Sequence, residues 1–381
     1  MIYLDNCSTS RPSPGVVEAM TLALNRFFAN PSALHDFGYG VKKEMEARRK
    51  QIAGFAGASP DQLIFTSGGT ESNNGAIHSH LLNQTKDKKT LLTTAIDHPS
   101  LRHSLEALKG DYRLVYLPLD EGGHIQVEAL KDYLSEDVAL VAYPHVHNEL
   151  GAINPIEEIN RVIKAYSKDI YIHVDGVQAL GKIEVNFSRS GADSYSFSGH
   201  KFHGPKGIGG LFLKEPARFK AFHQGGGQEG GHRSGTENIP GVFGLAKALE
   251  ELEGQVDKNY AHVASLKARA IDLIDKKIDQ VKINSKDPSS PYILHLSIKD
   301  IKGEVILHML EEKEIYISTG SACSSNAQEK SPVLDLLKLD RGYQEGALRI
   351  CFSKENTLEE IDYFVEVLSQ SVEDVRSLVR G

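Results

Sequence analysis

The stretch that decides the fold is Ser196-Phe197-Ser198-Gly199-His200-Lys201, which brings one lysine to the end of an expected strand. The strand is an apolar-rich run over 193–197, and a Gly-Pro-Lys-Gly turn follows at 204–207. A lysine amine held in this way can form a Schiff base with a carbonyl compound, and serine and histidine beside it can bind phosphate oxygens. An ordinary solvated lysine next to a turn would give the same local pattern.

A second stretch, Ile170-Tyr171-Ile172-His173-Val174-Asp175-Gly176-Val177-Gln178, favours the cofactor-binding interpretation. Strands of a parallel sheet that are buried on both faces form apolar runs, and catalytic groups lie at their carboxyl ends. Asp175 at such an end can hold the pyridine nitrogen of pyridoxal 5'-phosphate (PLP) protonated, and Gln178 can reach the phenolic oxygen of the ring. The two stretches together predict PLP as the cofactor, bound by Lys201 and Asp175.

Residues 176–182 also spell G-x-x-x-x-G-K after a strand, the pattern of a nucleotide phosphate loop. That motif needs a serine or threonine at the next position to ligate magnesium, and Ile183 stands there instead. A nucleotide site is therefore not expected at this place.

The phosphate end of a PLP site is predicted by Ile64-Phe65-Thr66-Ser67-Gly68-Gly69-Thr70-Glu71-Ser72-Asn73-Asn74. A strand runs into two glycines and then into a helix start, and the amide groups at helix N-termini bind phosphate. Gly69 and the Thr70 hydroxyl are the candidate contacts. A plain helix cap would look alike, but the position of this turn ahead of Asp175 and Lys201 favours phosphate binding.

The whole chain predicts an α/β fold with two domains. It has 381 residues, of which 40% are hydrophobic and 25% are charged, which is a globular composition. Strands alternating with helices from about residue 60 to 215 indicate a mainly parallel, seven-stranded sheet covered on both faces. The expected strands are Gln62–Thr66, Leu91–Ala95, Arg113–Leu117, Val138–Tyr143, Ile170–Val174, Asp193–Phe197 and Ile208–Leu213.

A helical pattern from Gly241 to about Lys277 then leads out of this layer. Beyond it, strands and helices alternate in what we expect to be a smaller α+β domain. The expected elements are the strands Tyr292–Ile298, Ile315–Ile317 and Leu348–Phe352 and helices near Glu304–Glu311 and Leu358–Val379. We assign 14–257 to the large domain, and 1–13 with 258–381 to the small one.

The net charge and the cysteine content limit the partners and the cellular location that we expect. The formal net charge of −8 leaves no basic stripe of the kind that nucleic acid requires. No apolar run approaches the roughly 20 residues that span a bilayer, and the N-terminus has no signal core, so no membrane partner is expected. Three cysteines are too few and too odd in number for a disulfide framework, which favours a reducing cytoplasm.

The cysteines differ in their surroundings. Cys323 lies in Ser318-Thr319-Gly320-Ser321-Ala322-Cys323-Ser324-Ser325-Asn326, a run of small polar residues suited to an exposed, nucleophilic thiol. Cys351 lies in an apolar run and is expected in the core. Cys7 lies in a polar N-terminal loop, where it can either line a site or pack.

In these motifs and in their order, the chain resembles the cysteine desulfurases, a PLP-dependent class-V aminotransferase family of the type I fold. The resemblance covers nearly the whole chain and includes Ser-Gly-His-Lys, Arg-Ser-Gly-Thr at 233–236 and Gly-Ser-Ala-Cys at 320–323. It implies conversion of L-cysteine to L-alanine, with the sulfur held on Cys323 as a persulfide for an acceptor protein, in iron–sulfur cluster assembly or thiolation.

The resemblance also implies the role of each site residue. Lys201 would carry PLP and, with Cys323 and His98, form the catalytic set, His98 stacking on the ring and moving protons. Arg349 would clamp the substrate carboxylate through its planar fork, with Asn148 near both the substrate and the ring oxygen. The phosphate contacts would be Gly69, Thr70, Ser198 and His200, joined by Thr236 from the other subunit of a homodimer.

Two positions depart from the family pattern. The opening loop reads Leu4-Asp5-Asn6-Cys7-Ser8-Thr9-Ser10 where the family usually has Leu-Asp-x-x-Ala-Thr-Thr, which puts an extra thiol near the expected site. His147 replaces a common asparagine and creates His145-x-His147, a spacing that a metal could use, although no metal is expected because PLP explains the site.

Two other functions remain open from the sequence. The nearer is another reaction of the same family, such as a selenocysteine lyase or a transaminase. The farther is a non-catalytic sulfur-relay or scaffold protein that has kept the fold, against which the complete set of Lys201, Asp175 and Cys323 argues.

Overall fold

The computed structural model describes residues 1–84, 87–320 and 331–380. Its largest sheet has seven strands in the spatial order β2-β8-β7-β6-β5-β3-β4. Only β8 among them runs antiparallel to its neighbours, so the expected mainly parallel sheet is confirmed. The strands are β2 (Leu63–Thr66), β3 (Thr90–Thr93), β4 (Arg113–Tyr116), β5 (Val138–Pro144), β6 (Tyr171–Asp175), β7 (Ser194–Ser198) and β8 (Gly209–Leu213).

The central strands are apolar because both faces of the sheet are covered. Every residue of β5 and β7 is buried, and α3 (Gly69–Asn83) packs against β6, β7 and β8. Polar residues that follow these strands therefore gather at one edge of the sheet, where their carboxyl ends meet. That edge holds Asp175 at the end of β6 and Lys201 just beyond β7.

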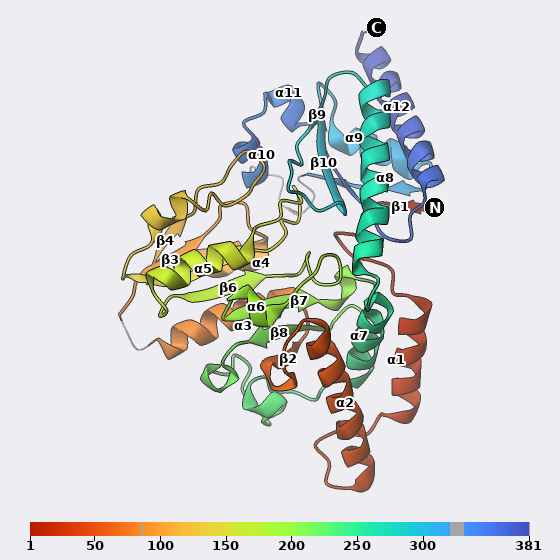
Figure 1. The fold of residues 1–381 in the computed structure, drawn as a ribbon. Helices are drawn as coiled ribbons and strands as arrows, with labels where there is room; N and C mark the ends of the chain where they lie inside the picture. The colour runs from red at the N-terminus through yellow and green to blue at the C-terminus, as the bar shows by residue number, and fades with distance from the viewer. Residues whose placement is uncertain (85–86, 321–330, 381) are drawn as a thin grey trace.

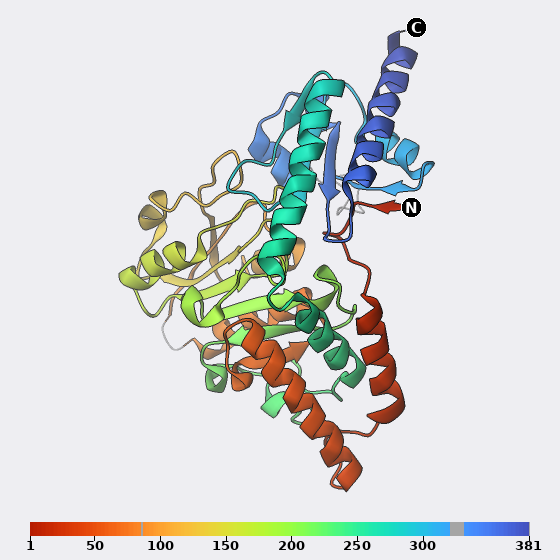
Figure 2. The same cartoon turned by 45° about the vertical axis from the view of Figure 1, so that its right-hand side comes forward.

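The helical pattern expected from Gly241 to about Lys277 is confirmed, and it forms two helices, α7 (Ile239–Leu252) and α8 (Val256–Lys277). The break between them includes Gly254, whose φ of +67° lies in the left-handed region that glycine adopts most readily and that ends a helix. Figures 1 and 2 show α8 leading from the seven-stranded sheet towards a second group of strands.

That second group is an antiparallel sheet in the order β12-β13-β10-β9. At the same end of the molecule, β1 (Ile2–Tyr3) pairs in parallel with β11 (Ile315–Tyr316) as a separate two-stranded sheet, and both termini lie there (Figure 1). The sheet strands are β9 (Val281–Ile283), β10 (Ile293–Ile298), β12 (Ser318–Thr319) and β13 (Ala347–Cys351). The exact division into domains at residues 13/14 and 257/258 stays a prediction.

The remaining helices cover and connect these sheets. They are α1 (Pro14–Arg26), α2 (Asp36–Phe55), α4 (Pro99–Glu106), α5 (Ile156–Tyr166), α6 (Phe187–Ser190), α9 (Gly303–Glu311), α10 (Pro332–Leu337), α11 (Arg341–Gln344) and α12 (Leu358–Arg380). Within the part of the chain that the structure describes, no helix is long and apolar enough to cross a membrane.

Candidate active site

Lys201 lies in a short 3-10 turn directly after β7, with its amine held by the N-terminal loop. Its Nζ donates to the carbonyl oxygens of Cys7 at 2.7 Å and Ser8 at 2.9 Å. Burial, and then the positive charge of Lys182, lower the pKa of this amine to about 8. A larger share of the amine is therefore neutral near pH 7 than in a solvated lysine, which is the form that attacks a carbonyl or removes a proton.

Asp175 ends β6, the strand next to β7, and its carboxylate is fixed from two sides. Asn73 Nδ2 donates to Oδ2 at 2.8 Å, and the Val177 amide donates to Oδ1 at 3.0 Å. Asp175 is only 6% exposed, so its carboxylate is largely shielded from water at the edge of the sheet that also holds Lys201. Such a group gains most from a cationic hydrogen-bond donor, which fits a protonated pyridine nitrogen.

An open pocket of about 450 Å³ lies at the start of α3, where phosphate binding is expected. Residues 67–70, Ser198, His200 and Lys206 are among those that line it. Gly68 has a φ of +149°, and a Cβ on Gly69 would meet Val177 Cγ2 at 2.5 Å, so both positions require glycine. The first amides of a helix have no partner within it. The donors therefore fit a phosphate group.

His98 caps α4 and is joined to Asp175 through a chain of polar contacts. The Ser100 amide donates to His98 Nδ1 at 3.2 Å, and Asn73 Nδ2 donates to Ser100 Oγ at 2.9 Å. Burial lowers the pKa of His98, against the charge of Asp175, which raises it. Because Nδ1 accepts the amide proton, the neutral ring carries its own proton on Nε2.

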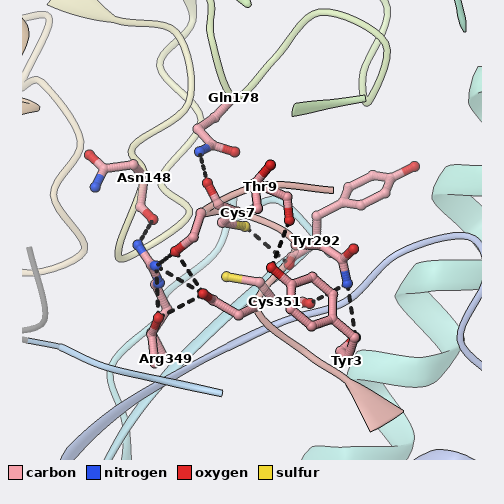
Figure 3. A network of polar contacts seen from close by, with 12 residues as sticks. Tyr3, Cys7, Thr9, Asn148, Gln178, Tyr292, Arg349 and Cys351 are labelled. Carbon is pink, nitrogen blue, oxygen red and sulfur yellow. Dashed lines mark hydrogen bonds and ion pairs between the residues drawn. The ribbon is translucent and has the colours of Figure 1, made fainter. Parts of the chain in front are cut away.

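Arg349, on β13, is buried and oriented by the opening loop (Figure 3). Its Nη2 lies 3.2 Å from Asp5 Oδ1 and donates to Ser8 Oγ at 2.8 Å, while Nη1 donates to the Asn148 carbonyl at 3.2 Å. The guanidinium is thus fixed beside the same loop that holds Lys201. This arrangement suits a carboxylate clamp.

Gln178 is buried, and both ends of its amide are engaged; Figure 3 shows its contact with the Cys7 carbonyl. Nε2 donates to the Cys7 carbonyl at 2.9 Å, and Lys182 Nζ donates to Oε1 at 2.7 Å. Sequence reasoning missed Lys182, although the G-x-x-x-x-G-K match pointed at it. The lysine orients Gln178 and places a positive charge near Lys201.

Asn73 is the second residue that sequence reasoning missed. Besides its contacts with Asp175 and Ser100, its Oδ1 accepts from His173 Nε2 at 2.9 Å and from Ser196 Oγ at 2.6 Å. It lay within the quoted phosphate stretch, but a polar residue on the buried face of a helix leaves no hydrophobic signal.

Thr236 does not lie with Thr70 in the phosphate pocket of its own chain. It is exposed and lines a separate pocket of about 260 Å³ together with Leu24 and Phe28. The loop before it is tied down by Arg49, whose Nη2 donates to Glu229 Oε1 at 2.6 Å, and by Arg233 Nε, which donates to Glu71 Oε1 at 2.8 Å.

The sequence also singled out the three cysteines and the His145-x-His147 pair. Cys323 lies outside the described residues. Cys351 is fully buried, as expected, and Cys7, which could either line a site or pack, is also buried. His145 Nδ1 contacts Tyr195 Oη at 2.9 Å and His147 Nε2 contacts the Ile96 carbonyl at 2.8 Å, so the two rings have separate partners.

Comparisons with known proteins agree with this geometry. The family described as aminotransferase class-V matches residues 2–364. A protein of Dictyoglomus turgidum named cysteine desulfurase IscS is 36% identical over 99% of this chain and 96% of its own. A protein of Clostridium botulinum with the same name is 35% identical over the same shares.

Among solved structures, one described as a NifS-like protein superposes with a TM-score of 0.91 at 33% identity, covering 98% of this chain and 99% of that one. Another, described as SspA in complex with cysteine, has a TM-score of 0.82 at 28% identity, covering 94% of this chain and 100% of that one. The chain therefore belongs to the class-V aminotransferase family of PLP-dependent enzymes, and the relatives it resembles are named cysteine desulfurases.

Proposed function

We propose that this protein is a cysteine desulfurase, which converts L-cysteine to L-alanine and transfers the sulfur to one of its own cysteines. The observation that carries the proposal is the placement of Lys201 and Asp175 at adjacent strand ends, beside the open pocket at the start of α3 and the buried Arg349. PLP, when bound there, would make the substrate α-carbon acidic by drawing electrons into its ring.

The residues of the chain would divide the remaining work. The Arg349 fork binds the substrate carboxylate, in place of some of its present contacts with Asp5 and Ser8. The Lys201 amine, with its pKa lowered to about 8, removes the α-proton of the substrate and would return it to the cofactor carbon. His98, held by Ser100, moves a proton at the thiol side of the substrate.

Cys323 would take the sulfur. Its thiolate attacks the substrate sulfur, a new S–S bond forms, and the carbon–sulfur bond breaks as the remaining carbon skeleton gains protons and leaves as L-alanine. The residue carries the sulfur as a persulfide until an acceptor thiol removes it. A sulfur-acceptor protein, in iron–sulfur cluster assembly or in thiolation, is the partner that this chemistry requires.

We also propose that the active site is completed in a homodimer. The support is the exposed Thr236, which is too removed from the phosphate pocket of its own chain to line it, next to the exposed apolar side chains of Leu24 and Phe28. A two-fold dimer would bring the same loop of each subunit to the other's site. Mixing Lys201→Ala with Thr236→Ala chains should then restore one working site in each mixed dimer, and a fully active monomer would contradict the dimer.

A cytoplasmic location is part of the same proposal. Its support is the odd number of cysteines and the need for a reactive persulfide, both of which suit a reducing compartment.

The substrate assignment is tested by comparing substrates on the PLP-loaded protein. L-Cysteine, L-selenocysteine and pairs of amino acid with keto acid are supplied in parallel, and alanine, sulfide and selenide are measured. Desulfuration of L-cysteine at a kcat/KM equal to or above that for selenocysteine supports the proposal. Activity only on selenocysteine would make it a lyase for that amino acid, and amino-group exchange with keto acids would make it a transaminase.

A further inference from the structure

Two cysteines that the proposed reaction does not use lie next to each other beneath the lysine site. Cys7 follows β1 in the opening loop and Cys351 ends β13, and their exposed fractions are 1% and 0%. They are 344 positions apart in the chain, yet Figure 3 draws both sulfur atoms within one compact network.

Backbone contacts hold the two cysteine positions together. The Tyr292 carbonyl accepts the Phe352 amide at 3.0 Å and contacts Cys7 Sγ at 3.8 Å, which places the Cys7 thiol beside the end of β13. From the other side, the Asn6 backbone amide and side chain donate to the Cys351 carbonyl at 3.3 Å and 3.1 Å. Neither cysteine can move far without breaking these contacts.

The two thiols are chemically unequal. Burial opposes ionisation of Cys7, but the neighbouring Cys351 thiol and the positive charge of Lys182 hold the pKa of the Cys7 thiol below its usual range. Burial raises the pKa of Cys351. One thiolate facing one thiol is the arrangement in which oxidation ends as a disulfide.

A small cavity lies next to the two cysteines, lined by their chain neighbours and by Lys201 but by neither cysteine itself. Its volume is about 20 Å³, and Asn6, Lys201, Tyr292 and Phe352 are among its lining residues. These include the immediate neighbours of both cysteines. A space of this size holds a molecule no larger than water or hydrogen peroxide, since one water needs about 10–15 Å³.

We propose that Cys7 and Cys351 form an oxidation site, at which hydrogen peroxide converts the two thiols into a reversible disulfide. The Cys7 thiolate attacks one peroxide oxygen, the O–O bond breaks, and hydroxide leaves and is protonated to water. Cys351 then attacks the sulfenic sulfur, the S–S bond forms, and the S–OH oxygen leaves as a second water. The two thiols lose two electrons and two protons, and the peroxide is reduced to two waters.

The oxidation reaches the active site through the Cys7 carbonyl. Lys201 and Gln178 both donate to this oxygen, at 2.7 Å and 2.9 Å. A disulfide draws the two sulfurs to bonding distance, so the Cys7 main chain moves. The hydrogen bond between the Lys201 amine and the Cys7 carbonyl then changes. The oxidised protein without cofactor should therefore recombine with PLP more slowly than the reduced protein.

The test uses the full-length, PLP-loaded protein treated with hydrogen peroxide and digested without reduction. The expected result is one peptide pair joined through Cys7 and Cys351 and lacking two hydrogens, which dithiothreitol separates. In a Cys323→Ser background all remaining thiols should disappear on titration. Glutathione disulfide, which is too large for the cavity, should not form this link.

Controls keep the outcome decisive. Cys7→Ser, an isosteric change in a loop, should abolish the link and keep the PLP recombination rate of the peroxide-treated protein equal to that of the untreated protein. The linkage in the unaltered sequence stands as evidence even if Cys351→Ser fails to fold. Separate sulfinic acids on the two cysteines, a link to Cys323 instead, or unchanged thiols at a peroxide dose that oxidises Cys323 would each overturn the proposal.

Discussion

The side-chain amide of Asn73 donates a hydrogen bond of 2.8 Å to the carboxylate of Asp175. Asn73 lies on α3, whose first turn borders the phosphate pocket, and Asp175 ends β6. The same side chain accepts from Ser196 on β7, the strand that leads to Lys201. One buried amide thus links the phosphate end, the ring-nitrogen end and the lysine strand of the cofactor site.

Asn73→Ala should weaken PLP binding. The variant removes the donor to Asp175 Oδ2 and leaves only the contacts at Oδ1. A hydrogen bond to a charged group contributes about 1.5–3 kcal/mol, which corresponds to a roughly 10- to 100-fold higher Kd. Titration of the cofactor-free protein with PLP, followed by absorbance, measures the change.

The matched control is Asn74→Ala, one position along the same helix. Asn74 Nδ2 donates only to backbone oxygens, of Thr70 at 2.9 Å and of Ser100 at 3.3 Å. Its loss should leave the PLP Kd within about threefold of the unaltered value, because exposed or partly exposed hydrogen bonds contribute less. Equal effects of the two variants would mean that Asn73 acts through α3 stability alone.

Lys201→Ala should abolish turnover and covalent attachment of PLP, while the phosphate pocket still retains some cofactor. After borohydride reduction and denaturation, the unaltered protein should keep PLP on the peptide containing residue 201, and the variant should release all of it. Lys214→Ala, an exposed lysine beyond β8, serves as the control. Reducible attachment in Lys201→Ala would move the cofactor lysine elsewhere.

Lys182→Gln should shift the pH at which PLP recombines with the cofactor-free protein. Burial and then the charge of Lys182 lower the pKa of the Lys201 amine to about 8, so recombination through the neutral amine should rise with pH and level off above about 8. Removing the charge raises that pKa, so the rising limb should move to higher pH and the rate at pH 7 should fall. Stopped-flow absorbance over about pH 6–10 measures the position of this rising limb.

Lys182→Arg is the control, since it keeps the charge and a donor for Gln178. Its limb should stay close to that of the unaltered protein. A limb that moves to lower pH in Lys182→Gln would show that the charge of Lys182 does not set the reactivity of Lys201.

Glu229→Ala should destabilise the protein and free the loop that carries Thr236. Glu229 bonds Arg49 at 2.6 Å and the Phe65 amide at 2.9 Å, and both charged side chains are at least nine-tenths buried. Leaving Arg49 unpaired should cost roughly 3–5 kcal/mol of unfolding free energy. Glu46→Ala removes the half-exposed partner of the same arginine and should cost about 1 kcal/mol or less. Urea unfolding compares the two, and equal losses would contradict the role of Glu229.

The seven strands of the large sheet could be predicted because strands buried in a mainly parallel sheet consist of apolar runs, with polar residues at their carboxyl ends. Each observed strand lies within two residues of its expected ends, and Asp175 and Lys201 fall at adjacent strand ends as the order of motifs implied. The helical pattern over 241–277 was correct, but the break between α7 and α8 could not be placed, because one glycine in a helical pattern does not reveal its φ angle.

The supporting contacts of the site could not be predicted, because they join residues far apart in the chain. Asp5 and Arg349 meet across 344 positions, and Gln178 and Lys201 both donate to the Cys7 carbonyl in the opening loop. Buried polar side chains such as Asn73 satisfy one another in three dimensions and leave no periodic pattern in the sequence.

The most direct test of the central claim is the balance of products from L-cysteine, measured on the PLP-loaded protein in the absence of any acceptor thiol. The account predicts one L-alanine for each sulfur released or retained, and a Cys323 peptide that gains the mass of one sulfur atom when trapped by alkylation. Cys323→Ser should bind PLP normally yet form little alanine, while Cys7→Ser stays active. Pyruvate and ammonia in place of alanine, or undiminished desulfuration in Cys323→Ser, would contradict the account.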